Sequence, residues 1–261
     1  MTILDKIFAR KLEQLEDLKA NVSLIDMKVM AADAPATRGF ARRLRESTHP
    51  VSLIAEVKKA SPVKGMIRED FYPVAIAKSY ERAGVDCLSV LTDEEFFQGS
   101  AQYLIDCREA TGLPVIRKDF TADEYHIYEA RAMGADCILL IAAMLTKSQV
   151  HDYRSLAEGL GMDVLVEVHS MEEAVTAIET GAGFIGVNNR DLRTFELNIE
   201  ATEEIVPWLN AQGAQTVSES ALRSHADIQR IQKAGARSAL IGTAFCESEP
   251  IEDRVREVMG W

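Results

Sequence analysis

Short apolar runs recur along the chain and alternate with amphipathic helical stretches. Within each run successive side chains face opposite sides, as they do in a β-strand. The runs are about 20 to 35 residues apart, a spacing that leaves room for a helix between them. They begin near Ser52, Asp86, Pro114, Asp136, Asp163, Phe184, Gln215 and Ser238. The pattern therefore predicts eight strands that alternate with helices.

Glycines mark the ends of the predicted helices. One stands a few residues before each of the second to eighth strands: Gly84, Gly112, Gly134, Gly161, Gly181, Gly213 and Gly235. Glycine suits the left-handed residue that ends a helix before the chain turns into a strand. Because alternating strands and helices imply parallel strands, eight such units predict an α/β fold, a closed (β/α)8 TIM barrel.

A doubly wound open sheet is the alternative architecture. It usually has a glycine-rich nucleotide turn after the first strand, whereas this chain has KKASPVKG there, without GxGxxG or a P-loop. No linker divides the 261 residues. We therefore expect a single domain over 1–261, in which residues 1–48 form an additional N-terminal helical segment.

The N-terminal segment has helical spacing of Ile3, Ile7, Leu12 and Leu15, and a second helical stretch surrounds residues 40–44. Acidic residues interrupt the first stretch, which argues against a signal peptide. No apolar run approaches the roughly 20 residues of a membrane helix. We therefore expect a cytoplasmic protein without a membrane partner.

Composition and charge narrow the classes of partner. The chain is 47% hydrophobic and 27% charged, and its four cysteines form no CxxC pair, which indicates free thiols rather than zinc ligands or disulfides. A net charge of −12 argues against a nucleic-acid partner. A small anionic molecule would need a local basic cluster, for which the candidates are Lys58, Lys59, Lys64, Arg117, Lys118, Arg190 and Arg193.

The first strand, SLIAEV, carries charge at its far end. Ile54, Glu56 and Lys58 share one face, while Leu53 and Val57 point the other way. A carboxylate and an amine beside an apolar strand cost desolvation energy unless they face a polar site. The arrangement predicts a ligand pocket at this end, with a surface ion pair as the alternative.

Four further strands are polar at the same end, where the active site of a (β/α)8 barrel lies. The polar groups are Lys118, Glu167, Asn188, Asn189, Arg190, Glu219 and Ser220. The alternative, that these residues merely cap the barrel, predicts similar polarity at the opposite strand ends. Those ends are mostly Gly, Pro, Asp or small residues, so a catalytic site is favoured.

Two loops are candidates for phosphate binding, and the histidines and one acidic run are considered as metal ligands. Loops after the last two strands commonly bind phosphate, and Gly242 would let the backbone approach it, or would simply relieve crowding at the barrel rim. The histidines, His49, His126, His151, His169 and His225, lack metal-ligand spacing and are interpreted as surface or packing residues. The acidic run at residues 93–95 is interpreted as a solvated loop.

Seven stretches together resemble the indole-3-glycerol phosphate synthase family of tryptophan biosynthesis over nearly the whole chain. They are IAEVKKASPVKGMIREDF, CLSVLTDEEFFQGS, IRKDF, DEYHIYEARAMGADCILLI, GMDVLVEVH, GVNNRDLRTFE and VSES. The resemblance implies a (β/α)8 barrel lyase that closes and decarboxylates 1-(2-carboxyphenylamino)-1-deoxyribulose 5-phosphate, releasing carbon dioxide and water. It implies no metal or organic cofactor and a small-molecule anionic substrate. A monomer is the working expectation for the oligomeric state.

The resemblance also implies roles for residues that match the family's motifs. The implied catalytic residues are Glu56, Lys58, Lys118, Glu167, Asn188 and Glu219, and the implied substrate-binding residues are Ser61, Arg190, Ser220, Ala221, Gly242 and Thr243. Lys118 resembles the acid that protonates the ketone oxygen during ring closure. Dehydration then needs a base and an acid, and Glu56, Glu167 and Lys58 are the available groups, with their roles undivided.

Three positions depart from the family's usual pattern, and all lie in binding loops. Val63 stands where the family usually has serine, Ala221 where it has glycine, and Thr243 begins a stretch where it has serine or glutamate–serine. An alanine at 221 is expected to need a negative φ. Two rival functions stay open: a class I Schiff-base aldolase, and a non-catalytic phosphate-binding barrel.

Overall fold

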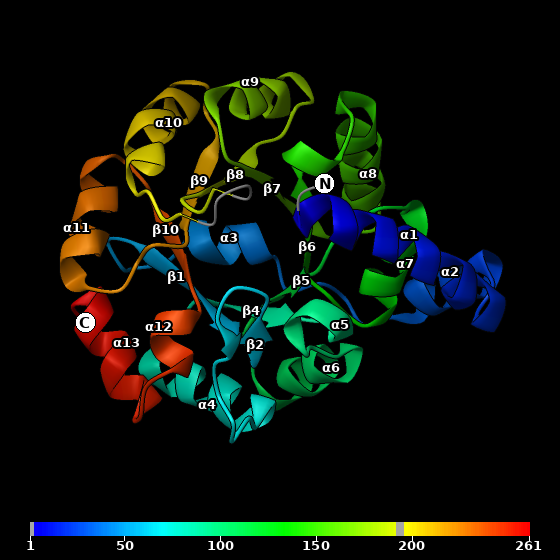
Figure 1. Ribbon diagram of the computed structural model, residues 1–261, viewed down its shortest axis with the longest axis horizontal. Coiled ribbons are helices and arrows are strands. Elements are labelled where there is room, and N and C mark those ends of the chain that lie inside the picture. Colours follow the sequence, from blue (N-terminus) through cyan, green and yellow to red (C-terminus); the bar gives the residue numbers. More distant parts are fainter. Residues whose placement is uncertain (1–2, 192–195) are drawn as a thin grey trace.

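The computed structural model describes residues 3–191 and 196–261, which form a closed barrel of eight parallel strands ringed by helices (Figure 1). Around the barrel the strands are β1 (Ser52–Val57), β4 (Cys87–Leu91), β5 (Val115–Lys118), β6 (Cys137–Ile141), β7 (Asp163–Val168), β8 (Phe184–Asn188), β9 (Gln215–Glu219) and β10 (Ser238–Ile241). The last pairs with β1, which closes the sheet. The predicted (β/α)8 barrel is confirmed.

Helices lie between successive strands and after the last one, and most of them cover the outside of the barrel (Figure 1). They are α4 (Pro73–Ala83), α5 (Glu94–Phe97), α6 (Ala101–Ala110), α7 (Glu124–Ala132), η1 (Ala142–Met144), α8 (Lys147–Gly159), α9 (Met171–Glu179), α10 (Glu200–Ala211), α11 (His225–Lys233), α12 (Thr243–Cys246) and α13 (Ile251–Met259). Six of the seven predicted cap glycines have positive φ. Gly112 is the exception, because Thr111 ends α6 in an extended conformation.

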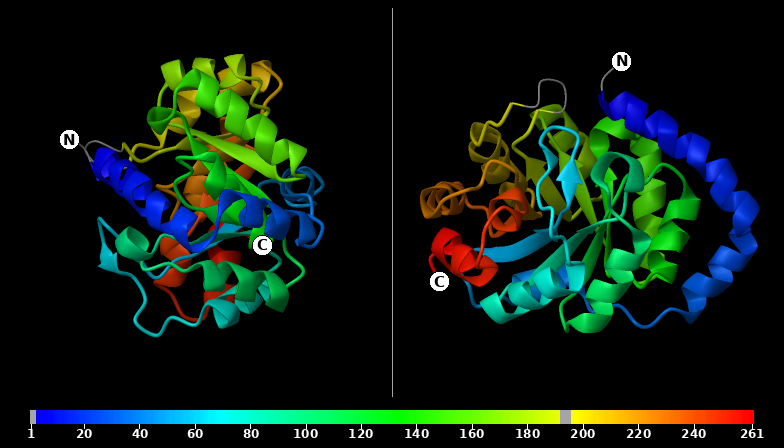
Figure 2. Two further views of the ribbon diagram at one scale, coloured as in Figure 1. Left: turned by 90° about the vertical axis from the view of Figure 1, so that its right-hand side faces the viewer. Right: turned by 60° about the horizontal axis from the view of Figure 1, so that its bottom comes forward.

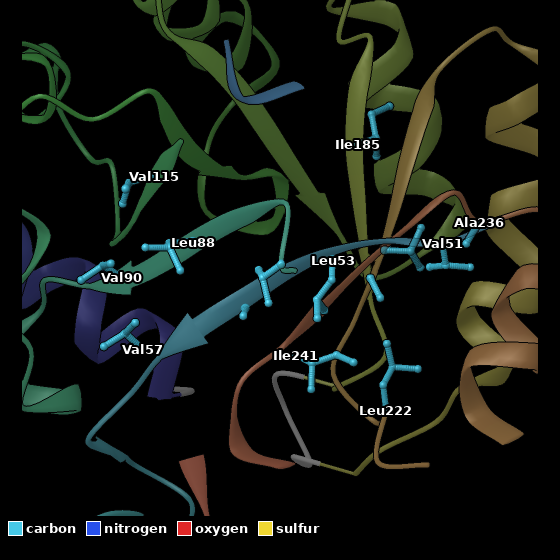
Figure 3. Close-up of a cluster of buried hydrophobic side chains, with 14 of the residues drawn as sticks. Val51, Leu53, Val57, Leu88, Val90, Val115, Ile185, Leu222, Ala236 and Ile241 are labelled. Atoms are coloured by element: carbon cyan, nitrogen blue, oxygen red, sulfur yellow. The ribbon is translucent and has the colours of Figure 1, made fainter. Parts of the chain in front are cut away.

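Strand alternation separates two apolar cores. Leu53 and Val57 point outward from β1 into the layer between sheet and helices, where Figure 3 shows them near Leu88. Ile54 points inward and belongs with Ile116 to the core inside the barrel. The next inward residues beyond Ile54 are the charged ones, so the alternation predicted from the sequence carries them to the barrel mouth.

Aspartates at the strand starts tie the opposite end of the barrel together. Asp86 accepts a hydrogen bond from the Leu53 N–H at 2.9 Å, and Asp136 accepts one from the Val115 N–H at 2.8 Å. Asp163 accepts one from the Ala41 N–H at 2.9 Å. Because backbone donors satisfy these carboxylates, the polar residues at this end have a structural function.

The N-terminal segment contains three helices: α1 (Ile3–Asn21), α2 (Leu24–Asp33) and α3 (Phe40–Arg45). Figure 2 shows the first two passing along one side of the barrel. Phe40 of α3 is fully buried and packs on Phe184 at the bottom of the inner core. The sequence analysis did not identify α2, nor the hairpin of β2 (Ala60–Ser61) and β3 (Gly65–Met66) after β1. Within the described chain, no helix combines the length and the apolar character needed to span a membrane.

Candidate active site

The twelve residues that the sequence predicts for catalysis and binding all line the same cavity, of about 210 Å³, at the carboxyl ends of the strands. They are Glu56, Lys58, Ser61, Lys118, Glu167, Asn188, Arg190, Glu219, Ser220, Ala221, Gly242 and Thr243. The chain brings them together because parallel strands in a closed barrel all end at the same mouth. Their roles stay a prediction, which the geometry below develops.

Four charged side chains form a layer across the barrel mouth. Glu56, Lys118, Glu167 and Glu219 come from β1, β5, β7 and β9, which are alternate strands around the barrel. Inward side chains from alternate strands share a level in barrels of this kind. This layer therefore holds three carboxylates around one ammonium, whereas the layer directly below it on the same strands is apolar, formed by Ile54, Ile116, Leu165 and Val217.

Glu56 is paired with the lysine two residues further on. Lys58 Nζ lies 3.1 Å from Glu56 Oε1, and the Ser89 hydroxyl donates to Glu56 Oε2 at 3.3 Å. Gly242 makes room for this carboxylate, because a Cβ at position 242 would lie 2.6 Å from Glu56 Oε1. Gly242, directly after β10, therefore leaves the space that the Glu56 side chain occupies. This packing role is independent of any contact between the Gly242 backbone and a ligand.

Lys118 lies between two of the carboxylates. Its Nζ is 2.9 Å from Glu167 Oε2 and 3.3 Å from Glu219 Oε2, and its side chain is only 14% exposed. Burial alone would lower the pKa of Lys118, but Glu167, Glu219 and Glu56 outweigh burial and raise the pKa above its ordinary value. The side chain is therefore a fully charged ammonium at neutral pH.

Glu167 is held from three sides. Besides Lys118, Asn188 Nδ2 donates to Glu167 Oε1 at 3.1 Å, and His169 Nε2 lies 3.2 Å from the same oxygen. Burial favours the neutral acid, but the charge of Lys118 and the contact with His169 lower the pKa of Glu167 well below its usual range. Glu167 is therefore a carboxylate at neutral pH. The sequence interpretation of His169 as a surface or packing residue missed this contact.

Glu219 has the opposite electrostatic environment, although it shares Lys118. Its Oε1 is buried without a hydrogen-bond partner in the described structure and lies against Gly186, where a Cβ would be 2.0 Å away. Burial raises the pKa of Glu219 to about 7, against the opposing charge of Lys118. Two carboxylates at one ammonium thus have pKa values displaced in opposite directions, a pattern typical of acid/base sites.

The loops after β9 and β10 form the adjoining wall of the cavity. Ser220 and Ala221 have φ values of 64° and 60°, so both are left-handed. The expectation that Ala221 would have a negative φ is wrong, and its Cβ costs about 1–2 kcal/mol in this conformation. After β10, Gly242 and Thr243 begin the short helix α12. Arg190 faces the same cavity from beyond β8 and is partly buried.

Comparison with protein-family models matches residues 4–258 to the model of indole-3-glycerol phosphate synthase. The chain belongs to the indole-3-glycerol phosphate synthase family. A synthase of that name from Desulfotalea psychrophila is 51% identical and covers 98% of each chain, and one from Laribacter hongkongensis is 45% identical and covers 95% of each. The family's activity, a carboxy-lyase reaction of tryptophan biosynthesis, is therefore the activity of this chain.

Solved structures that resemble this synthase agree on the barrel. A 3-hexulose-6-phosphate synthase matches with a TM-score of 0.63 and 17% identity, over 80% of this chain and 99% of that one. The tryptophan synthase α-subunit of Pyrococcus furiosus matches with a TM-score of 0.61 and 10% identity, over 82% and 99%. At these identities the likeness concerns the fold alone.

The synthase cavity has an apolar wall that the sequence analysis did not foresee. Ile3, Leu4 and Ile7 of α1 line it together with two aromatic rings, those of Phe97 and Phe120, whose centroids are 6.0 Å apart. The helical spacing of Ile3 and Ile7 was the available signal. The N-terminal helix is therefore part of the cavity wall.

A buried ion triad anchors α1 at that wall. Lys11 Nζ lies 2.8 Å from both Asp93 Oδ2 and Asp119 Oδ1. Asp93 also caps α5, which carries Phe97, and Asp119 directly precedes Phe120. The interpretation of residues 93–95 as a solvated loop is wrong for Asp93, which is 1% exposed.

The predicted basic cluster is divided. Lys58, Lys64, Lys118 and Arg190 line the synthase cavity, whereas Lys59 and Arg117 are not among the described lining residues. Arg117 turns to α7, where it is 2.7 Å from Glu129 and donates to the His126 carbonyl. Arg193 lies outside the described residues. In the described ranges, no three His, Cys, Asp or Glu side chains are grouped to hold a metal ion.

Proposed function

We propose that this cavity binds 1-(2-carboxyphenylamino)-1-deoxyribulose 5-phosphate and that Lys118 is the general acid for ring closure. The observation that carries the assignment is the position of the Lys118 ammonium between Glu167 and Glu219, at the mouth of the barrel. As the arene carbon attacks the ketone carbon, negative charge develops on the ketone oxygen. A buried, charged ammonium donates a proton to that oxygen and stabilises it.

The later steps need a base and a second acid. Ring closure is followed by loss of carbon dioxide from the same arene carbon, and dehydration then removes a ring proton and the hydroxyl. Glu167 is assigned as the base because it is a carboxylate at neutral pH and lines the cavity beside Lys118. Lys58, 3.1 Å from Glu56, is assigned to the substrate carboxylate and to the departing hydroxyl. Asn188 orients Glu167, and Glu219 orients Lys118.

The remaining residues are assigned to binding. Ser220, Ala221, Gly242 and Thr243 come from the loops after two adjacent strands, β9 and β10, which in (β/α)8 barrels commonly hold phosphate. Arg190 and Ser61 line the same cavity from beyond the two flanking strands, β8 and β1. The apolar wall, with its two phenylalanine rings, suits the aromatic ring of the substrate.

The decisive experiment follows the fluorescence of the indole product after the carboxyphenylamino substrate is added to the enzyme. A rise that disappears in Lys118→Met supports the assignment. No signal at micromolar enzyme would overturn it and would favour a non-catalytic phosphate-binding barrel. A Schiff-base aldolase needs a neutral amine, which the raised pKa of Lys118 opposes. Borohydride reduction with a keto-phosphate should accordingly trap no adduct on Lys118 or Lys58.

The cellular setting is part of the proposal. We assign the chain to the cytoplasm, as a monomer with a small anionic substrate and without a nucleic-acid partner. The four cysteines, Cys87, Cys107, Cys137 and Cys246, are free and buried, as is usual for thiols in a reducing compartment. Light scattering coupled to size-exclusion chromatography tests the monomer directly.

A further inference from the structure

His169 is a buried titratable group behind the catalytic layer. It directly follows the last residue of β7 and lies two positions after Glu167. Its side chain is 10% exposed, and its Nε2 lies 3.2 Å from Glu167 Oε1. On its other side Nδ1 lies 3.2 Å from Glu173 Oε2 on α9, and the same oxygen accepts the backbone N–H of His169 at 2.8 Å.

The charges of the layer at the barrel mouth explain why Glu167 needs a second cation beside it. Glu56 has Lys58 as its own partner, but Glu167 and Glu219 share Lys118. If Lys118 turns toward the ketone oxygen of a substrate, its attraction to Glu167 weakens. A buried carboxylate without a cation takes up a proton or loses its orientation, because an isolated charge is costly in a site that excludes water.

We propose that His169 is a positioning residue of the synthase reaction: as an imidazolium held by Glu173, it keeps Glu167 ionised and oriented while Lys118 engages the substrate. The inference rests on the proposed role of Glu167 as a base. His169 is faced by Glu167 from its own strand and by Glu173 from α9, and Lys118 and Asn188 act on it through Glu167.

The pKa of His169 agrees with its position between Glu167 and Glu173. Burial alone would lower the pKa of His169, but its contacts with Glu167 and Glu173 raise the pKa to about 10. The ring therefore carries its proton throughout the neutral range. Asn188 supplies Glu167 with a hydrogen bond but no charge, so it does not replace the imidazolium.

Two variants separate the charge of His169 from its volume and its hydrogen-bonding capacity. His169→Gln keeps an amide donor and removes the charge, and we expect kcat to fall at least tenfold at pH 7.5 with KM changed less than threefold. His169→Lys restores a cation and should recover most of that loss. The matched control is His151→Gln, which replaces an exposed histidine on α8 and should leave both constants unchanged.

The protonation state is measured without turnover, in the wild-type enzyme. Nitrogen-15 NMR of labelled histidine should show His169 as an imidazolium up to at least pH 8.5. Glu173→Gln should lower its titration midpoint by about one pH unit and move the alkaline limb of the kcat profile by a similar amount. A neutral ring at pH 7.5, or full activity of His169→Gln, would overturn the inference.

A wrong assignment of Glu167 as the base can be distinguished from a wrong role for His169. If Glu167→Gln keeps near-normal turnover, Glu167 is not the base, and the proposed function is wrong at that residue. If Glu167→Gln is inactive while His169→Gln matches the wild type, only the inference about His169 fails.

Discussion

The ammonium of Lys118 lies 2.9 Å from the carboxylate of Glu167, although β6 runs between the strands that carry them. The contact is possible because side chains from alternate strands of the barrel point inward at one level. Neither residue is near the other in sequence, but each lies in phase with the inward face of its own strand. The barrel therefore brings this pair together, and its chemical role can be tested by substituting either Lys118 or Glu167.

Lys118→Met should lower kcat by at least 10²–10⁴-fold, the usual contribution of a general acid. Product binding should change little, because methionine keeps most of the volume of the side chain. Steady-state kinetics and a product titration measure the two effects. The matched control is Lys147→Met, which removes a lysine that is paired with Glu179 on the surface. A loss confined to substrate affinity would mean that Lys118 only binds.

Glu219→Gln should inactivate the enzyme but stabilise it at alkaline pH. Burial raises the pKa of Glu219 from its ordinary 4.5 to about 7, so the native state binds a proton that the unfolded chain releases. Its contribution to stability is present below pH 4.5 and is lost as the pH rises through 7. The variant should escape this loss, which amounts to at most about 3 kcal/mol.

Urea unfolding at pH 5 and at pH 8 measures this difference. The stability advantage of Glu219→Gln over the wild type should be larger at pH 8. Glu203→Gln is the control, because it removes an exposed glutamate whose pKa is lowered by Arg230 and should show no such alkaline gain. An advantage that is equal at the two pH values would contradict the raised pKa of Glu219.

Much of this site was predictable from the sequence because two simple rules suffice for it. Alternation along a strand decides which side chains point inward, and parallel strands end at one mouth. Glu56, Lys118, Glu167 and Glu219 follow from those rules alone. The barrel itself follows from the spacing of eight apolar runs, which the closed sheet confirms.

The features that were missed depend on contacts that strand alternation does not predict. His169 directly follows β7, and its charge depends on Glu167, two residues before it, and on Glu173 of α9, four residues after it and 3.2 Å away. Asp93 is buried and pairs with Lys11 on the N-terminal helix, which is distant in the sequence. The left-handed φ of Ala221 likewise follows from the path of the loop after β9, and its residue type argues against it.

Lys11→Met should loosen α1 and weaken substrate binding. The substitution leaves Asp93 as a buried carboxylate without its cation, whereas Asp119 keeps Arg117 at 3.3 Å; an unpaired buried charge typically costs about 3–5 kcal/mol. Because α1 supplies part of the cavity wall, we expect KM to rise by about tenfold, with a smaller fall in kcat. Limited proteolysis should cleave within α1 sooner than in the wild type.

Lys19→Met is the matched control for that helix. Lys19 pairs with Asp123 at 3.3 Å, but its side chain is 36% exposed, so its loss leaves no buried charge. The control should keep both the KM and the protease resistance of the wild type. Equal effects of the two variants would show that the buried triad does not anchor α1.

Ala221→Gly should stabilise the enzyme, and its effect on ligand binding is a separate question. The left-handed conformation costs alanine about 1–2 kcal/mol, and the greater freedom of glycine in the unfolded chain offsets about 0.4–1 kcal/mol of the relief. A net gain of up to about 1.6 kcal/mol is therefore expected in urea unfolding. Gln98→Gly is the control, since Gln98 is also left-handed, at φ 51°, but exposed and outside the loops after β9 and β10.

Binding distinguishes strain from crowding, because the strain is present in both the free and the bound enzyme. If the Ala221 methyl group crowds the phosphate, calorimetric titration with a phosphate-bearing product analogue should show binding up to about tenfold tighter in the glycine variant, or roughly 1.4 kcal/mol. Gln98→Gly should leave that affinity unchanged, and turnover should change little in either protein. Weaker binding in Ala221→Gly would mean that the alanine holds the loop in its binding conformation, so that its strain serves to preorganise the site.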